Sequence, residues 1–453
     1  MLFRSLKINS FSNFQIRLPS LPSFNKLSGG QSKFGDKKIC VITGTSSGLG
    51  KATTKWLLDT GNWHIICAVR DVDKMNTVAE VEGFDPKSFT VMQLDLASFQ
   101  SVKDFAEELK IFKADKPLDR LVCNAAVYQP SLPDAKYTED GIEQQLQINH
   151  LSHFLLSSLL VSPKLLITVN ASVRLISTVF YLLQIPEMKG AENPRLIMVG
   201  SVTGNDNTVG GGGVYPIADL KDLDGLARGG KEPIAMIDGF NFNGAKAYKD
   251  TKMCLMMTSN TLHDRYHRST GIAFSAIYPG CIAESPLFRE KRPWFRKYFP
   301  VFMKYVTGGF VGEVEAGQRL GQVVADPRCS KSGVYWSWNG GPRQGRGMEA
   351  LKNGGNIVGA GGAGGDWESI FENDQSDKVR DPEKMALLWK YSNEVIMILS
   401  YKLHGLYFST LICSVRRDSE YGVNHCICLL SLSLKTTNLP FNFCRSLVLS
   451  GHP

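Results

Sequence analysis

The sequence lacks the patterns that hold structural metals. Its ten cysteines stand mostly alone, and the closest pair, Cys426 and Cys428, has no further cysteine or histidine at zinc spacing. We therefore expect reduced thiols and no metal site. The chain also lacks a long run of lysine or arginine, so its net charge of +8 does not indicate nucleic acid as a partner. An anionic cofactor or an anionic membrane surface remains compatible with that charge.

Acidic residues are missing from positions 1–35, which hold five basic residues and seven serines. This composition is typical of an organelle transit peptide, and the segment has no continuous apolar core of the kind that a secretory signal carries. The alternative is a plain basic tail. Long apolar runs are missing too, because no stretch of roughly 18 uncharged apolar residues occurs before position 397, and we predict no transmembrane helix there.

A glycine-rich turn follows the first predicted strand, residues 38–43, and precedes a segment with helical character. A strand, such a turn and a helix in this order direct backbone N–H groups and a helix N-terminus at phosphates. The spacing therefore predicts a dinucleotide site. Its residues are Gly44, Ser46, Ser47, Gly48, Leu49 and Gly50.

Further strands are predicted at residues 64–69, 89–94 and 118–122, alternating with helices. This alternation predicts an α/β fold, a single Rossmann-type doubly wound parallel sheet with ligands at the carboxyl ends of its strands. Arg70 and Lys74, after the second strand, suit a ribose 2′-phosphate and favour NADPH over NADH. The alternative is a pair of solvated surface charges.

The third and fourth strands supply the rest of the predicted cofactor site. Asp95 and Leu96 follow the third strand, and Asn124, Ala125 and Ala126 follow the fourth. Small side chains at positions 125 and 126 would let a nicotinamide ribose lie close to the backbone.

Tyr248 and Lys252 lie four residues apart in a segment, 243–257, whose apolar spacing predicts a helix. They would therefore project from one face. A nearby ammonium favours phenolate, so we expect Lys252 to lower the pKa of Tyr248 towards working pH and to make its phenol a general acid. By itself, a tyrosine and a lysine at this spacing more often belong to a solvated helix face. The other motifs of the chain decide whether this pair is catalytic or merely exposed.

These segments, with Asn149, together resemble the short-chain dehydrogenases/reductases and their Asn, Ser, Tyr, Lys active-site set. More narrowly, CNAAVY, NHLSHFLL, AMIDG, GAKAYKDTKMC, IYPGCIA, PLFRE and KSGVYWSWN are similar, in this order, to segments of the light-dependent NADPH:protochlorophyllide oxidoreductases. The resemblance covers about residues 36–396, which we expect to form the reductase domain.

The resemblance implies a short-chain dehydrogenase fold, NADPH as cofactor and the magnesium tetrapyrrole protochlorophyllide as substrate. Family members reduce its C17–C18 double bond in plastids when light excites the pigment, giving chlorophyllide. Carried over, Tyr248 would donate the proton and Lys252 would hold the nicotinamide ribose, with Asn149 and Ser201 completing the set. Thr203 is close enough to compete for the role of Ser201.

The segment YPGCIA contributes three residues to these expectations. Gly280 belongs to the predicted cofactor site and Tyr278 to the predicted substrate site. Cys281 matches a family cysteine linked to substrate binding, and it is the alternative proton donor to Tyr248. A lone cysteine is more commonly an inert buried thiol.

Residues 287–310 are rich in aromatic and basic side chains. Such a mixture suits a flat apolar ring system bearing a propionate, or peripheral contact with an anionic plastid membrane. We expect an extended substrate lid that places Phe288, Phe295 and Phe299 against the substrate. The alternative is that these aromatic side chains simply pack in the hydrophobic core. Self-association of the protein is also possible.

Three segments depart from the family pattern. Residues 161–184 form an apolar, β-rich insertion; residues 340–365 hold eleven glycines and are typical of a flexible surface loop; residues 397–453 form an atypical tail. We hypothesise that the tail, and with it the insertion, is unspliced intron in the gene model. Finding both stretches in mature transcripts would refute this.

Two other functions fit the same residues. One is a dark short-chain reductase of a lipophilic, retinoid-like carbonyl; the other is a non-catalytic NADPH-binding scaffold disabled by the insertion. Cys281 and the aromatic, basic segment favour the photochemical reductase over the first. The intact Asn149, Tyr248 and Lys252 argue against the second.

Overall fold

The structure, a computed structural model, describes residues 33–161, 187–205, 213–229, 232–305, 310–338 and 370–403, together with four short strands between 406 and 448. The segments in which we expect the transit peptide, the apolar insertion and the glycine-rich loop lie outside these residues, apart from 33–35 and Val161. The hypotheses on those segments stay predictions.

An eight-stranded sheet forms the centre of the fold, in the order β3-β2-β1-β4-β5-β6-β7-β8. Neighbouring strands pair in parallel from β3 to β7, whereas β8 runs antiparallel to β7. The doubly wound α/β prediction is confirmed, and the antiparallel edge strand is an addition to it. The strands are β1 Lys38–Thr43, β2 Trp63–Val69, β3 Phe89–Gln93, β4 Arg120–Cys123, β5 Arg195–Val199, β6 Ala273–Tyr278, β7 Val334–Trp338 and β8 Ile370–Asn373.

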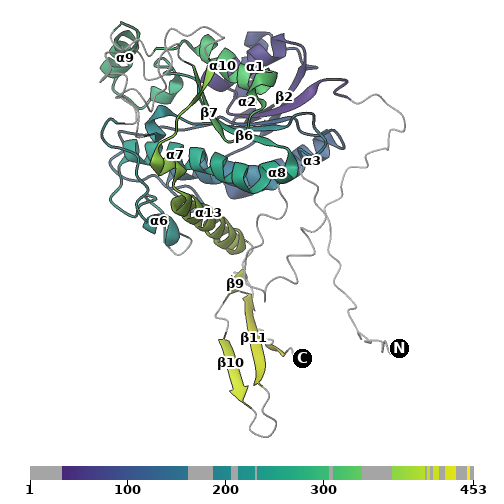
Figure 1. Cartoon of the computed structure of the whole chain (residues 1–453), viewed down its shortest axis with the longest axis vertical. Coiled ribbons are helices and arrows are strands. Elements are labelled where there is room, and N and C mark those ends of the chain that lie inside the picture. Colours follow the sequence, from purple (N-terminus) through teal and green to yellow (C-terminus); the bar gives the residue numbers. More distant parts are fainter. Residues whose placement is uncertain are drawn as a thin grey trace. The chain divides into compact units, whose positions relative to one another are not determined.

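Helices cover both faces of this sheet (Figure 1). On one face lie α1 (Gly48–Asp59), α2 (Val72–Glu82) and α10 (Glu313–Ala325), and on the other lie α3 (Phe99–Lys113) and α7 (Gly244–Leu262). This arrangement leaves the carboxyl ends of the parallel strands open for ligands.

The remaining elements connect or extend these layers. A π-helix, η1 (Leu146–Leu151), leads into α4 (Ser152–Val161), and α13 begins at Pro382 and continues past position 396 to Leu403. The short helices are η2 Val202–Gly204, α6 Asp224–Ala227, η3 His263–His267, α8 Arg268–Thr270, η4 Pro286–Phe288, η5 Pro327–Ser330 and α12 Asp377–Arg380, and the longer α9 spans Pro293–Tyr305. A separate antiparallel sheet comprises β9 Leu406–Phe408, β10 Ile412–Arg417, β11 Asn424–Leu434 and β12 Ser446–Val448.

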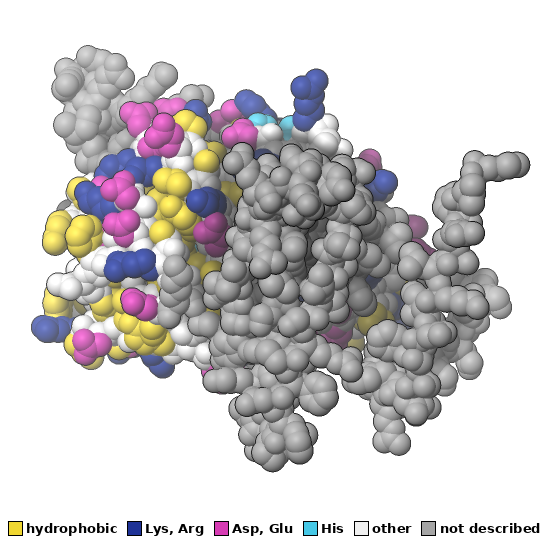
Figure 2. Space-filling view, turned by 90° about the horizontal axis from the view of Figure 1, so that it is seen from below, with side chains coloured by type: hydrophobic (Ala, Val, Ile, Leu, Met, Phe, Trp, Pro, Cys, Tyr) yellow, Lys and Arg dark blue, Asp and Glu magenta, His cyan; other side chains and the backbone are white. Residues whose placement is uncertain are grey.

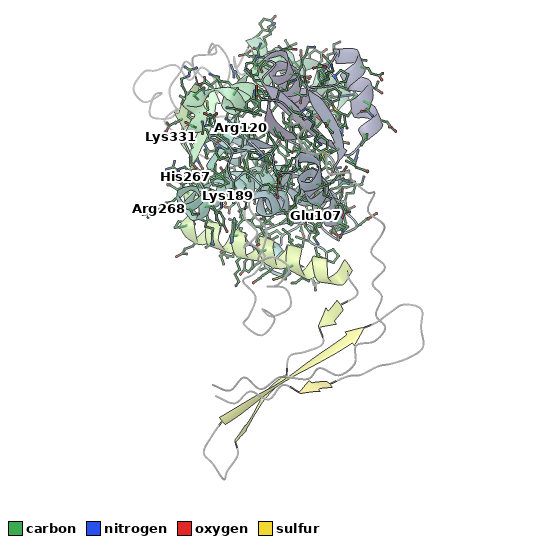
Figure 3. All side chains as sticks on the ribbon, turned by 90° about the vertical axis from the view of Figure 1, so that its right-hand side faces the viewer. Glu107, Arg120, Lys189, His267, Arg268 and Lys331 are labelled. Carbon is green, nitrogen blue, oxygen red and sulfur yellow. The ribbon has the colours of Figure 1, made fainter. Side chains whose placement is uncertain are left out.

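Two buried arginines on the central strands hold the end of α10. The Nε of Arg120 donates to the carbonyl of Val324 (2.7 Å), and Nη1 of Arg195 donates to the carbonyls of Val323 and Asp326 (2.7 Å each). Carbonyls in the last turn of a helix have no partner within the helix, and a cation there complements its dipole. In Figure 3, Arg120 is labelled among the packed side chains. The sequence pattern did not single out either arginine.

The surface of the described chain mixes charges of both signs. On the face drawn in Figure 2, lysine and arginine side chains lie beside aspartate and glutamate side chains, with apolar side chains between them. Within the described residues, no helix combines the length and the apolar character needed to cross a bilayer.

Candidate active site

A cavity of about 1250 Å³ lies at the carboxyl ends of the strands. It is lined by the glycine-rich turn after β1, by residues that follow β4, β5 and β6, by α7 and by the segment up to Tyr305. A volume of roughly 300–1000 Å³ accommodates one drug-sized ligand. This cavity therefore has room for a dinucleotide together with a second large molecule.

The glycine-rich turn forms one end of the cavity, and all six of its predicted residues line it. Helix α1 starts at Gly48, and Ser47 in the cap position makes no side-chain cap hydrogen bond within the described chain. A Cβ on Gly50 would lie 2.6 Å from Nδ2 of Asn124 and still closer to the carbonyl oxygen of Gly44. The turn thus leaves N–H groups at a helix N-terminus for an anion and tolerates no side chain at position 50.

Asn124 and Thr43 lock this turn to the end of β4. Thr43 Oγ1 accepts hydrogen bonds from the backbone N–H groups of Asn124 and Ala125, both at 2.9 Å, and Asn124 Nδ2 donates to the carbonyl of Thr43 (2.8 Å). Asn124, Ala125, Ala126 and Gly280 all line the cavity, as the cofactor prediction requires.

Four predicted cofactor residues lie outside the cavity lining. Arg70 and Lys74 are exposed at the end of β2 and the start of α2. Leu96 is buried, and Asp95 accepts a hydrogen bond from the backbone N–H of Ala97 (2.9 Å). Their roles towards the adenosine half of a cofactor stay predictions.

Helix α7 carries the central pair, and its predicted start is confirmed. Asn243 caps the helix, with its side chain accepting a hydrogen bond from the N–H of Lys246 (3.0 Å). Tyr248 and Lys252 are both buried and both line the cavity, so the solvated-face interpretation is wrong. The Nζ of Lys252 lies 5.6 Å from the centroid of the Tyr248 ring and donates to the carbonyl of Val199 (2.8 Å).

The expected lowering of the Tyr248 pKa is wrong. Burial raises the pKa of Tyr248 well above its ordinary value, and Tyr128 and Cys281 nearby raise it further. Burial also lowers the pKa of Lys252 to about 7, so this lysine is only partly charged near neutral pH. A half-charged ammonium does not outweigh the desolvation of the phenolate. The phenol of Tyr248 therefore stays protonated, which suits a proton donor.

Asn149 lies behind the cavity wall and does not line it. It is fully buried in the π-helix η1, where its side chain accepts from the N–H of Val127 (2.8 Å) and donates to the carbonyl of Val127 (3.0 Å) and to Oγ1 of Thr251 (3.2 Å). Thr251 belongs to α7, so Asn149 ties the segment after β4 to the helix that carries Tyr248. Single π-helical turns are frequent at functional sites.

Ser201 and Thr203 both line the cavity and are joined to each other. Thr203 Oγ1 lies 2.9 Å from Ser201 Oγ and donates to it, and the Thr203 N–H donates to the same oxygen (3.2 Å). Cys281 is half-buried in the lining, and burial raises the pKa of its thiol to about 12. Tyr278 is buried and also lines the cavity.

Helix α9 closes the far side of the cavity and has no buried residue, so the alternative that its aromatic side chains pack in the hydrophobic core is wrong. Its inner stripe, Phe295, Phe299 and Met303, faces the cavity, with Phe295 and Phe299 stacked at a centroid distance of 4.5 Å. Its outer stripe, Trp294, Tyr298 and Val301, is outside the lining and is 60%, 58% and 52% exposed. Phe288, also in the lining, packs on Phe299.

Several lining residues were not predicted. Tyr128 lies 4.6 Å from Tyr248 between ring centroids, and Lys249 brings further positive charge to the wall. Lys291, which also lines it, belongs to the basic segment 287–310 in which the substrate lid was expected. The segment Val214 to Pro216 also contributes. The position of Lys249 directly after Tyr248 was the one sequence signal that could have indicated that this lysine lines the cavity.

Comparisons with known proteins show which family the chain is similar to. The sequence model of the family described as short chain dehydrogenase matches residues 38–179. Protochlorophyllide reductase A, chloroplastic, from Arabidopsis thaliana is 45% identical over 381 residues, covering 83% of this chain and 81% of that protein. Protochlorophyllide reductase, chloroplastic, from Daucus carota is 44% identical, with 83% and 82% covered. Protochlorophyllide reductase from Avena sativa is 44% identical over 79% of this chain and 99% of that protein.

Proposed function

Since the chain belongs to the protochlorophyllide reductases, we propose that it catalyses the light-driven, NADPH-dependent reduction of the C17–C18 double bond of protochlorophyllide. Membership makes it an oxidoreductase of chlorophyll biosynthesis that uses a nicotinamide cofactor. The observation that carries the finer proposal is one cavity of about 1250 Å³, in which a phosphate-binding turn, the Tyr248–Lys252 pair and an aromatic lid meet.

The residues at one end of the cavity fit a nicotinamide dinucleotide. The turn from Gly44 to Gly50 would hold its phosphates, and the small Ala125 and Ala126 leave space for a ribose beside Lys252. Exposed Arg70 and Lys74 would bind the 2′-phosphate that distinguishes NADPH. When bound, NADPH supplies the hydride.

Tyr248 is the proton donor in this proposal. Its phenol is protonated and lies in the cavity wall, and Lys252 is close enough to stabilise the phenolate that remains after transfer. Asn149 positions α7 through Thr251. Cys281 is the competing donor, since burial keeps its thiol protonated as well; the ammonium of Lys252 beside the Tyr248 ring is what favours Tyr248.

The lid excludes water and shapes the substrate site. Its inner stripe offers stacked rings to a flat macrocycle, which gains affinity by aromatic contact. We further propose a plastid location, because relatives are named chloroplastic. We also propose peripheral lipid contact, because the outer stripe exposes apolar rings beside Arg296 and Lys297, which are exposed themselves. Flotation with anionic lipid vesicles tests this contact.

Absorbance of the protein mixed with protochlorophyllide and NADPH, recorded in darkness and after a flash, tests the reaction. A red shift only after light supports the proposal. Turnover in darkness would indicate an ordinary reductase instead, and pigment binding without any conversion would indicate a scaffold.

The variant Tyr248→Phe tests the proton donor. We expect the proton-transfer step to slow by roughly 10²- to 10⁴-fold, because a positioned acid contributes that much. NADPH binding, followed by fluorescence, should stay unchanged, since the ring and Lys252 remain. Unaltered photoconversion by Tyr248→Phe would assign the proton to another group, with Cys281→Ser as the next variant to compare.

A further inference from the structure

His153 is a fully buried histidine that joins two sides of the active site. It lies in α4, one helical turn after Asn149, and both of its ring nitrogens have hydrogen-bond partners. Nε2 lies 2.9 Å from Oγ1 of Thr43 at the end of β1, and Nδ1 lies 3.0 Å from the backbone carbonyl oxygen of Asn149. The proposed function gives this residue no task.

The hydrogen bonds of Thr43 determine which nitrogen of His153 carries the proton. Oγ1 of Thr43 accepts from the backbone N–H groups of Asn124 and Ala125, both at 2.9 Å, so its two lone pairs are in use. Its hydroxyl proton is donated, and Nε2 of His153 at 2.9 Å is a nearer acceptor than the carbonyl of Val122 at 3.4 Å. Nε2 is then unprotonated, and the proton lies on Nδ1, which donates it to the carbonyl one turn back.

The surroundings keep this ring neutral. Burial lowers the pKa of His153 to about 4, with a contribution from the nearby Lys252 and against the opposing effect of the bond to Asn149. A doubly protonated ring would direct a second donor at the Thr43 hydroxyl and place another cation near Lys252. The neutral ring has one acceptor and one donor, so it joins its two partners in a single orientation.

Each nitrogen leads to a different part of the proposed reaction. Through Thr43, Nε2 fixes the backbone at Ala125, which lines the cavity where a nicotinamide ribose would lie. Through its carbonyl partner, Nδ1 fixes the π-helical turn of Asn149, whose side chain donates to Thr251 of α7. A single ring thus connects the cofactor wall to the helix of the proton donor.

We propose that His153 is a positioning residue with two separable tasks: Nε2 sets the affinity for NADPH, and Nδ1 sets the rate of proton transfer from Tyr248. This rests on the proposed function, in which NADPH lies against Ala125 and Tyr248 donates the proton. Reacting groups must be held to within a fraction of an ångström, and each nitrogen holds one of them through its own partner. A ring that only filled space would serve both sides equally.

Two substitutions divide these tasks, because each keeps one polar atom of the ring. In His153→Asn the amide nitrogen is attached to Cγ, as Nδ1 is, and can donate to Asn149, but the Thr43 hydroxyl loses its acceptor. In His153→Gln the amide oxygen takes the place of Nε2, but the donor to Asn149 is lost. We expect His153→Asn to raise the Kd for NADPH by roughly 3- to 10-fold, the range of one neutral hydrogen bond, with proton transfer little changed. His153→Gln should slow proton transfer on the order of 10-fold and leave the Kd within about twofold.

His64 supplies the matched control. It is also a buried histidine bound to a threonine hydroxyl, with Nε2 2.9 Å from Oγ1 of Thr90. It lies near the start of β2 and outside the described cavity lining. His64→Asn and His64→Gln should therefore lower the free energy of unfolding without changing the NADPH affinity or the proton-transfer rate.

Two measurements in darkness separate this proposal from the photoreaction. Fluorescence titration gives the NADPH affinity, and hydrogen exchange follows the N–H of Ala125, bound to Thr43, and that of Val127, bound to the Asn149 side chain. Faster exchange at Ala125 in His153→Asn alone, and at Val127 in His153→Gln alone, supports the proposal even where a lack of photoconversion refutes the proposed function. Equal changes in both variants would overturn it, because the ring would then serve the fold alone. So would no change in either, or the reverse pattern, which would contradict the assigned tautomer.

Discussion

Behind the cavity wall, hydrogen bonds lead from Thr43 through His153 to Asn149 and from Asn149 to Thr251 of α7, whereas the lid helix α9 has no buried residue. We call this set, together with α7 and the Gly44–Gly50 turn that Asn124 joins to Thr43, the floor. The polar groups of this hydrogen-bonded set are joined one to the next, so that moving one of them breaks a bond to its neighbour. The lid touches the rest of the protein through half-buried rings such as Phe295 and Phe299.

The difference follows from what each part must do. Hydride and proton transfer need reacting groups held to a fraction of an ångström, and rigid, fully bonded elements provide this. A large flat substrate must enter and leave, and a segment with little buried apolar area can open at small cost. Mutations in the floor should therefore abolish chemistry or folding, while mutations on the inner stripe of the lid should change substrate affinity alone.

The largest effect is expected from Gly50→Ala in the floor. The new Cβ would lie 2.6 Å from Asn124 Nδ2 and closer still to the Gly44 carbonyl, and backbone atoms cannot move aside cheaply. Displacing the phosphate turn by even an ångström should cost on the order of 100-fold in activity. NADPH titration and photoconversion measure this. Gly312→Ala, where nothing lies within 4 Å of the added Cβ, is the matched control; equal behaviour of both variants would contradict the rigid-floor interpretation.

Arg120→Met should produce the largest loss of stability outside the cavity. It removes donors from the carbonyl of Val324 (2.7 Å), which is buried, and from that of Asn193 (2.7 Å), which is partly buried. We expect a decrease of roughly 3 kcal/mol in the free energy of unfolding, because each unpaired buried carbonyl costs about 1–3 kcal/mol. Chemical denaturation gives this value. The exposed Arg268, labelled at the edge of Figure 3, supplies the control Arg268→Met, and similar losses in both would refute the role of burial.

Lys252 should make the stability of the floor depend on pH. Its folded pKa of about 7 lies below the ordinary 10.5, so the unfolded chain takes up a proton in this window that the folded chain does not. The contribution of Lys252 to the free energy of unfolding therefore falls by about 1.4 kcal/mol per pH unit as the pH drops from 10.5 to 7. Below pH 7 this contribution is constant. Lys252→Met should lose that slope. Parallel stability curves for the two proteins between pH 7 and 10 would contradict the buried, partly neutral lysine.

Local patterns in the sequence were sufficient for much of the floor. The strand β1, the glycine-rich turn and the start of α7 at Asn243 depend on neighbouring residues, and each lies where it was predicted. The antiparallel pairing of β8 with β7 was not predictable, because it joins segments separated by more than thirty residues. Pairing over such distances leaves no short-range signal.

The pKa shifts and the partners of the buried charged residues could be found only from the packed structure. The Tyr248 pKa was expected to fall because the sequence shows a lysine four residues away, but the pattern does not show how deeply both groups are buried. Arg120 and Arg195 likewise look like isolated charges in apolar strands until α10 folds against them. The repulsion by which Lys291 lowers the pKa of Lys249 depends on where the lid lies.

The smallest effects on stability are expected in the lid, where its two stripes can be separated. Phe299→Ala on the inner stripe should change the free energy of unfolding by less than about 1 kcal/mol, since the ring is only half-buried. It should nevertheless raise the KM for the pigment by about 10-fold, because a stacked ring facing the substrate is lost.

Trp294→Ala on the outer stripe is the matched variant. It removes a ring of similar size that is 60% exposed and outside the cavity lining. We expect the KM for the pigment in solution to be unchanged and binding to anionic vesicles to weaken, which flotation measures. If Trp294→Ala raised the KM as much as Phe299→Ala, the two stripes would share one role, and the outer face of α9 would belong to the substrate site instead of to a membrane contact.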